Sequence, residues 1–266
     1  MNKTLLIIDP QNDFCDIPEA LTMGNKPSLP VPGSHNDMIT LANYIKNNSD
    51  SFSEVVVTLD SHNIIDIAHK LWWVDKDGNH PSPFTVITLE DIENKVWVPS
   101  KSSDLEYAKF YVSELKKANK YSLIIWPEHC LIGSWGHNVH SVLAEALSEW
   151  TKKTGKNVEY ILKALNPLTE HYSAIKAEVE LDEHTHRNVK LLDKMAVSDE
   201  LLVAGEAFSH CVSSTVFDIK DYFDEKNIKT KITVFENCTS PVYGFEETSK
   251  KIKEEMINKG LAFMNV

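Results

Sequence analysis

The sequence predicts an α/β protein of three layers, in which helices cover both faces of a six-stranded, mostly parallel sheet. Six short apolar runs rich in β-branched residues are separated by segments with helical periodicity. This alternation is typical of βαβ units with right-handed crossovers. The runs are nearly continuous rather than alternating, as expected for strands buried on both faces.

The elements follow one another along the whole chain. Strands are expected, in order, at Thr4–Ile8, Glu54–Leu59, Ser122–Trp126, Val158–Leu162, Leu201–Ala204 and Lys231–Phe235. Helical spacing of apolar residues is clearest at Asp104–Ala118, Asn138–Lys152, Arg187–Lys194, Val212–Glu225 and Glu246–Lys259. Residues 71–103 fit worst, and we expect there an irregular insertion of turns with a short hairpin, of the kind that forms lids or oligomer contacts.

Composition bounds the domain organisation. The chain of 266 residues is 42% hydrophobic and 25% charged, and it shows no repeat or linker, so we expect a single domain over residues 1–266. This length allows a large core without disulfides or a structural metal. The four cysteines are widely spaced and form no CxxC pair, which favours a reduced, cytoplasmic protein.

Charge and hydropathy exclude several classes of partner. The net charge is −12 and Arg187 is the only arginine, so we expect no binding to nucleic acid. The N-terminus passes from Lys3 directly into a strand and lacks the apolar region and cleavage site of a signal peptide. No apolar stretch reaches the length of a membrane span, so no membrane partner is expected.

Reactive side chains follow the ends of five predicted strands. In a parallel sheet the carboxyl ends share one edge, and ligands of open α/β sheets bind there. A carboxylate, an ammonium, a thiol and imidazoles on that edge together predict an active site. The side chains are, in strand order, Asp9, Asp60 with His62, His129, Lys163 and Cys211.

Cys211 stands at the start of a predicted helix, just after a strand that stops at Gly205. A helix N-terminus lowers the pKa of a thiol, which suits a nucleophile, although a lone cysteine is often an inert core residue. Asp9 and Lys163 favour the nucleophile. Asp9 can take the thiol proton and later return it, while Lys163 keeps Asp9 ionised and favours the thiolate.

A metal site is predicted beside this set. Asp60 and His62 are two residues apart on an extended segment, so their side chains point to the same face. With His129 from the next strand they supply one carboxylate and two imidazoles, as in catalytic zinc, iron and manganese sites. His69 is a candidate fourth ligand or a residue supporting the ligands. We expect one divalent transition metal, with zinc preferred over iron or manganese.

These residues resemble the nicotinamidase/pyrazinamidase branch of the isochorismatase-like cysteine hydrolases. The matching motifs occur in family order between positions 5 and 212: LLIIDPQNDFC, TLDSH, WPEHC, ILK followed by HYSA, and VAGEAFSHCV. The resemblance implies the isochorismatase-like hydrolase fold. It also implies a catalytic triad made of Asp9, Lys163 and Cys211. The implied metal ligands are Asp60, His62 and His129.

Further roles rest on the resemblance alone. It implies that Phe14 and Trp126 sandwich a substrate ring. It also implies a cis peptide bond between Glu206 and Ala207, with the backbone N–H groups of Ala207 and Cys211 forming an oxyanion hole. The implied reaction is deamidation of nicotinamide to nicotinic acid and ammonia through a thioester at Cys211, a step of NAD salvage. The expected partners are a small-molecule amide and, in a homo-oligomer, further copies of the chain.

Two alternatives stay open. One is a related amidase acting on another carboxamide or carbamoyl substrate, although such relatives generally lack the metal ligands. The other is a non-catalytic ligand-binding protein on the same fold. Glu206 stands where an apolar residue is usual, and Phe208-Ser209 replaces a common Thr-Asp. These departures touch the pocket wall, so the exact amide is left open.

Overall fold

A six-stranded sheet forms the centre of the computed structural model, which describes residues 2–118 and 120–266. All neighbouring strands run parallel, in the spatial order β10-β9-β8-β1-β2-β7. The predicted α/β class with a six-stranded parallel sheet is confirmed. The strands are β1 (Lys3–Ile8), β2 (Glu54–Asp60), β7 (Glu159–Lys163), β8 (Glu200–Gly205), β9 (Lys231–Phe235) and β10 (Ala262–Met264).

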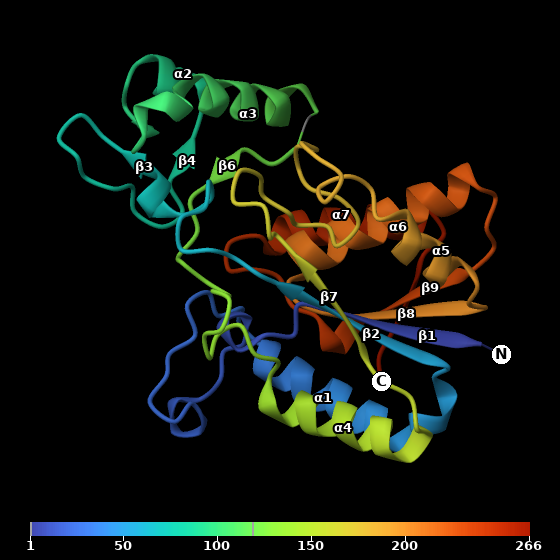
Figure 1. Cartoon of the computed structure of the whole chain (residues 1–266). Helices are drawn as coiled ribbons and strands as arrows, with labels where there is room; N and C mark the ends of the chain where they lie inside the picture. Colours follow the sequence, from blue (N-terminus) through green and yellow to red (C-terminus); the bar gives the residue numbers. More distant parts are fainter. Residues whose placement is uncertain (1, 119) are drawn as a thin grey trace.

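Helices cover both faces of this sheet (Figure 1). Leu5 and Ile7 of β1 pack into the apolar cluster under one helical layer, and Leu6 and Ile8 into the cluster under the other. This alternation is what a strand buried on both faces requires. The first layer consists of α1 (Ser34–Asn47) and α4 (Ser141–Thr154); the second consists of α5 (Val189–Ala196), α6 (Ser213–Glu225) and α7 (Glu246–Asn258).

The expected insertion at 71–103 forms a small lobe beyond the carboxyl ends of the central strands (Figure 1). Together with residues 105–124, the lobe contains two short antiparallel pairs rather than one hairpin, because β3 pairs with β5 and β4 pairs with β6. Two helices cover these pairs. The elements are β3 (Trp73–Val74), β4 (Val86–Ile87), α2 (Leu89–Glu93), β5 (Val98–Pro99), α3 (Leu105–Lys117) and β6 (Leu123–Ile124).

One predicted sheet strand was wrong. Residues 122–126 do not enter the central sheet; they form the short β6, and β10 takes the sixth place. The edge of β2 is already occupied by β7, so the segment after β6 runs beside the chain that leaves β2. Isolated bridges join His69 to Trp126 and His62 to Leu131. The end of β6 therefore still reaches the sheet edge where the reactive residues gather.

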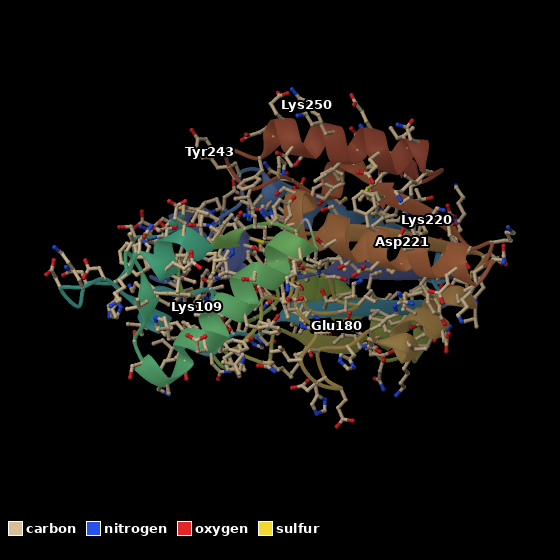
Figure 2. The ribbon with its side chains drawn as sticks, turned by 90° about the horizontal axis from the view of Figure 1, so that it is seen from above. Lys109, Glu180, Lys220, Asp221, Tyr243 and Lys250 are labelled. Atoms are coloured by element: carbon tan, nitrogen blue, oxygen red, sulfur yellow. The ribbon has the colours of Figure 1, made fainter. Side chains whose placement is uncertain are left out.

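The other expected elements match the structure within a few residues, with two additions. Helix α1 and strand β10 were not among the expected elements. Charged side chains such as Lys109, Lys220 and Lys250 project from the outer surfaces of α3, α6 and α7 (Figure 2). None of the described helices is long and apolar enough to cross a membrane. That residues 1–266 form a single domain stays a prediction.

Candidate active site and metal centre

Sharp backbone turns end the strands that carry the site. Asp9, the residue after β1, has φ of 42°, and Ala164, directly after Lys163, has φ of 60°. Such left-handed conformations are uncommon outside glycine and often occur at functional positions. At the end of β8, a Cβ on Gly205 would lie 2.0 Å from the carbonyl oxygen of Ile8. Glycine there lets β8 approach β1 closely enough to bring the two strand ends together.

Lys163 is the centre of the predicted nucleophile set. Its buried Nζ lies 3.0 Å from Oδ2 of Asp9 and 3.6 Å from Sγ of Cys211. The same Nζ lies 2.9 Å from Oδ1 of Asp60 and donates to the carbonyl of His171 at 2.8 Å. Burial alone would lower the pKa of Lys163, but Asp60 and Asp9 outweigh burial and raise it well above its usual value. The amine is therefore a permanent cation between the two carboxylates.

Cys211 differs from the sequence-based expectation in two respects. It lies inside a π-helical turn, Phe208–Val212, that leads into α6. Burial raises the pKa of its thiol; Lys163 opposes this, but Asp9 and Asp60 add to it, and the pKa ends well above its usual value. The expected lowering of the thiol pKa was therefore wrong. The resting group is a thiol, and Asp9 beside it can receive its proton when the sulfur attacks.

Asp9 is held for this role from two sides. The Thr58 hydroxyl donates to Oδ1 of Asp9 at 2.6 Å, and the Lys163 ammonium pairs with Oδ2. Burial raises the pKa of Asp9, the charge of Lys163 lowers it, and the charge of Asp60 raises it; the result is a raised pKa. A buried carboxylate with a raised pKa is a stronger base than one in water, which suits proton exchange with a thiol.

Three histidines form a cluster with the chemistry of a metal site. Candidate ligand atoms of His62, His69 and His129 lie within 4.8 Å of one another. The Nδ1 atoms of the three rings face acceptors: the Asp66 carboxylate at 3.1 Å, the Asn63 carbonyl at 3.2 Å and the Pro127 carbonyl at 2.8 Å, respectively. Each Nδ1 must therefore donate, which leaves Nε2 as the basic nitrogen of each ring. The structure thus brings His69 into the predicted cluster.

Asp60 joins the metal cluster to the nucleophile set. Its Oδ2 lies 3.2 Å from Nε2 of His62 and 3.5 Å from Nε2 of His129, while its Oδ1 pairs with Lys163. Burial would raise the pKa of Asp60, but its contacts with His62, Lys163 and His129 hold it well below its usual value. The carboxylate stays ionised, as a metal ligand must.

His69 provides the test of whether these residues fit a metal. Its Nε2 is buried and has no hydrogen-bond partner among the described residues. Burial lowers the pKa of His69 to about 2, with His129 and His62 adding to the effect, so the ring is neutral. A buried, neutral, unpartnered nitrogen is costly without a ligand. The donor set of three imidazoles and one carboxylate therefore fits a divalent transition metal.

Removal of a residue that only hydrogen-bonds to a metal ligand lowers metal affinity by about 10- to 100-fold. We predict a larger loss of affinity for His69→Ala, because a ligand atom itself is removed. Competition with a chelator, followed by metal analysis of the protein, measures the change. His80→Ala is the matched control, since His80 is exposed and lies in the insertion. Equal metal affinity in the two variants would contradict the assignment of His69 to the metal site.

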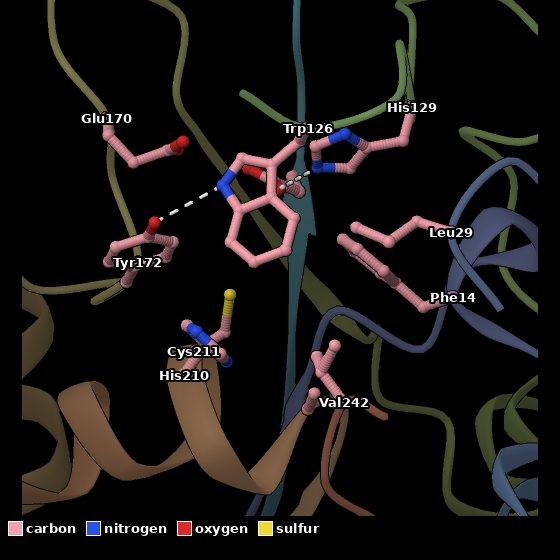
Figure 3. A pocket seen from close by; sticks show the side chains of 11 residues that line it. Phe14, Leu29, Trp126, His129, Glu170, Tyr172, His210, Cys211 and Val242 are labelled. Atoms are coloured by element: carbon pink, nitrogen blue, oxygen red, sulfur yellow. Dashed lines mark hydrogen bonds and ion pairs between the residues drawn. The ribbon is translucent and has the colours of Figure 1, made fainter. Parts of the chain in front are cut away.

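The nucleophile and the metal cluster share one cavity, which Cys211, Asp60 and His129 line. Phe14 and Trp126, which the resemblance implied as substrate-binding residues, line it, and both are almost fully buried. Figure 3 shows the Cys211 sulfur pointing toward the indole of Trp126. Phe14 and Leu29 lie on the side of the cavity opposite Tyr172. Trp126 Nε1 donates to the Tyr172 hydroxyl at 3.2 Å, which fixes the plane of the indole.

Sequence reasoning missed two polar side chains of this cavity. Glu170 lies at its rim with one carboxyl oxygen unpartnered among the described residues, and burial raises its pKa to about 7. His210 lines the cavity with an Nε2 that has no hydrogen-bond partner in the described part of the chain, and burial lowers its pKa to about 4. Glu170 directly precedes the motif HYSA, and His210 lies inside VAGEAFSHCV next to Cys211, so these positions were the available signal.

The peptide bond between Glu206 and Ala207 is cis, as the resemblance implied. Ala207 and Cys211 both line the cavity. The carbonyl of Ala207 accepts from the backbone N–H groups of His210 and Val212 at 3.0 and 3.2 Å. These bonds stabilise the turn in which Ala207 and Cys211 both face the cavity.

The chain resembles known proteins in its fold rather than in its overall sequence. No family model matches the chain, and no curated protein matches it. Among solved structures, the yeast nicotinamidase is 20% identical, with a TM-score of 0.66 over 99% of this chain and 100% of that one. An Acinetobacter nicotinamidase/pyrazinamidase is 20% identical (TM-score 0.62, 99% and 96% of the two chains). A Pyrococcus horikoshii pyrazinamidase in complex with zinc is 17% identical (TM-score 0.58, 100% of both chains).

The resemblance seen in the five motifs is thus matched by likeness over the whole chain. At these identities the likeness concerns the fold. The protein has the fold of the solved nicotinamidases and pyrazinamidases.

Proposed function

We propose that the protein is a metal-containing cysteine amidohydrolase that converts nicotinamide to nicotinic acid and ammonia. One observation carries this proposal. A buried lysine joins a carboxylate and a thiol, and the cavity beside the thiol is also lined by Asp60 and by His129, which belongs to a cluster of three histidines. A thiol with its own base performs acyl transfer. The likeness of the fold to nicotinamidases supports the choice of substrate.

In the proposed reaction, Asp9 takes the thiol proton of Cys211 as the sulfur attacks the amide carbon. The backbone N–H groups of Ala207 and Cys211 receive the developing oxyanion. Asp9 then returns the proton to the departing ammonia, which leaves the acyl group as a thioester on Cys211. A water that gives a proton to Asp9 attacks the thioester; the bond to sulfur breaks, the acid is released, and Asp9 passes the proton to the Cys211 sulfur. Lys163 balances the negative charge of Asp9 throughout.

Asp60, His62, His69 and His129 would hold the metal. A metal there would supply a Lewis acid suited to the ring nitrogen of a pyridine amide, and would so help to orient the substrate. Phe14 and Trp126 would flank the ring, because aromatic faces stack favourably on it. Zinc is our preferred ion, since three imidazoles and a carboxylate suit it and a structure of similar fold is a zinc complex.

Ammonia release over a panel of amides tests this proposal. Nicotinamide and pyrazinamide should be hydrolysed, whereas benzamide, which has the same shape without a ring nitrogen, should be hydrolysed at least about tenfold more slowly, since one lost polar contact costs about 1.4 kcal/mol or more. Equal rates for benzamide and nicotinamide would contradict the role of the metal. Preference for a carbamoyl substrate would favour the related amidase instead.

Two finer expectations belong to the same proposal. We expect the protein to act in the cytoplasm, and to form a homo-oligomer because closed symmetric assemblies are common among enzymes.

A further inference from the structure

A buried carboxyl group lies directly behind the nucleophile turn and has no part in the reaction proposed above. Glu206 precedes Ala207, and its side chain is fully buried. Burial raises the pKa of Glu206 well above its usual value, and Asp37 raises it further. An ionisable group is costly at such a position and needs a structural or functional reason.

Glu206 connects the nucleophile turn to the loop that forms one wall of the cavity. One oxygen, Oε2, accepts from the backbone N–H of Ser240 at 3.1 Å. Two further bonds join the same segments: the Phe208 N–H donates to the Ser240 carbonyl at 2.9 Å, and the Val242 N–H donates to the Ser209 hydroxyl at 3.1 Å. Because Val242 lines the cavity, this connection couples the wall to the nucleophile turn.

A second carboxyl group neighbours that of Glu206. A hydrogen bond joins Glu206 to the side chain of Asp37, in the first turn of α1, and among the described residues Oε1 of Glu206 has no other N–H or O–H donor. The Ser240 hydroxyl donates to Oδ2 of Asp37 at 2.6 Å. Two carboxyl groups in contact need one shared proton. The helix N-terminus favours the charge on Asp37, so the proton belongs on Glu206.

We propose that Glu206 is a positioning residue: a protonated carboxyl that donates to Asp37 and accepts from Ser240, thereby clamping the Ala207–Cys211 turn and the cavity wall to helix α1. This inference rests on the proposed function for its catalytic consequence. The proposed hydrogen bonds of Glu206 to Asp37 and Ser240 do not depend on that function. The other titratable groups acting on this pair are the carboxyl of Asp16 and the thiols of Cys15 and Cys238. They bring no positive charge, and so they favour retention of the proton.

Three variants test the clamp. Glu206→Gln keeps one donor and one acceptor in the same shape, so its kcat should stay within about threefold of the wild type. Glu206→Leu removes both and should lower kcat about 10- to 100-fold with a smaller change in KM, because misplacement of reacting groups by a fraction of an ångström has effects of that size. Ser240→Ala, at a half-buried position, removes only the hydroxyl link to Asp37 and should show an intermediate loss.

The pH dependence of stability gives a readout without any substrate. A carboxyl whose pKa is raised on folding contributes stability that is fully present below its unfolded pKa of 4.5 and is lost as the pH rises through the folded pKa. Urea unfolding of the wild type should therefore show stability falling with pH above about 4.5, and this fall should be shallower in Glu206→Gln. The comparison is informative even if Glu206→Leu does not fold.

The outcomes separate this inference from the proposed function. A wild type that releases no ammonia from nicotinamide overturns the function, while a shallower pH slope in Glu206→Gln still supports the clamp. Three results would each overturn the clamp. The first is a wild-type kcat in Glu206→Leu, and the second is an equal loss of kcat in Glu206→Gln and Glu206→Leu. The third is an identical pH dependence of stability in the wild type and Glu206→Gln.

Discussion

Cys211→Ala should abolish nicotinamide hydrolysis while leaving the fold intact. Removal of the nucleophile from an enzyme that forms a covalent intermediate typically lowers kcat by about 10⁴-fold or more. The side chain is small and lies at the cavity surface, so its loss should leave little strain. Steady-state ammonia release measures the effect, and circular dichroism checks the fold.

Cys238→Ala is the matched control for this prediction. Cys238 is a buried thiol that packs in the apolar cluster under α1 and α4, away from the reacting atoms. The control should keep kcat within about twofold of the wild type, since truncation of a small core residue mainly affects stability. Activity in Cys211→Ala equal to that of Cys238→Ala would rule out the thioester route.

Lys163→Met should have the largest effect on stability. Methionine fills most of the lysine volume but leaves the carboxylates of Asp9 and Asp60 buried without their shared cation. Breaking a buried ion pair by removal of one partner costs about 3–5 kcal/mol in the free energy of unfolding. The deficit should shrink as the pH falls, because protonated carboxyl groups need no cation. Urea unfolding of metal-free protein at two pH values measures both effects.

Lys153→Met provides the comparison at the surface. Lys153 pairs with Asp50 at 2.8 Å, but both side chains are largely exposed. An exposed pair contributes about 0–1 kcal/mol, so this variant should be close to wild type at either pH. Equal destabilisation by the two methionine substitutions would show that the Lys163 charge does not hold the site together.

Much of the site could be predicted because it lies at the ends of parallel strands. Topology alone places residues that end different strands on one edge, and this was enough to bring together Asp9, Asp60, Lys163 and Cys211. His129 reached the site by another route. Its segment is not a sheet strand but runs beside residues 62–69, and a local apolar pattern does not distinguish these two pairings.

The missed features depend on tertiary contacts or on weak local signals. Helix α1 buries Met38, Leu41 and Ile45 at helical spacing, but polar residues around them obscure the pattern. Strand β10 has only three residues and gains its place by pairing with β9. The raised pKa of the Cys211 thiol follows from its burial and from Asp9 and Asp60, which only the folded chain brings beside it.

The central claim is tested most directly by nicotinamide deamidation measured on one preparation before chelation, after chelation and after addition of zinc. We predict equal amounts of ammonia and nicotinic acid from the metal-loaded protein, loss of the activity on chelation, and its return with zinc. No release of ammonia above the uncatalysed rate by zinc-loaded protein would contradict the claim.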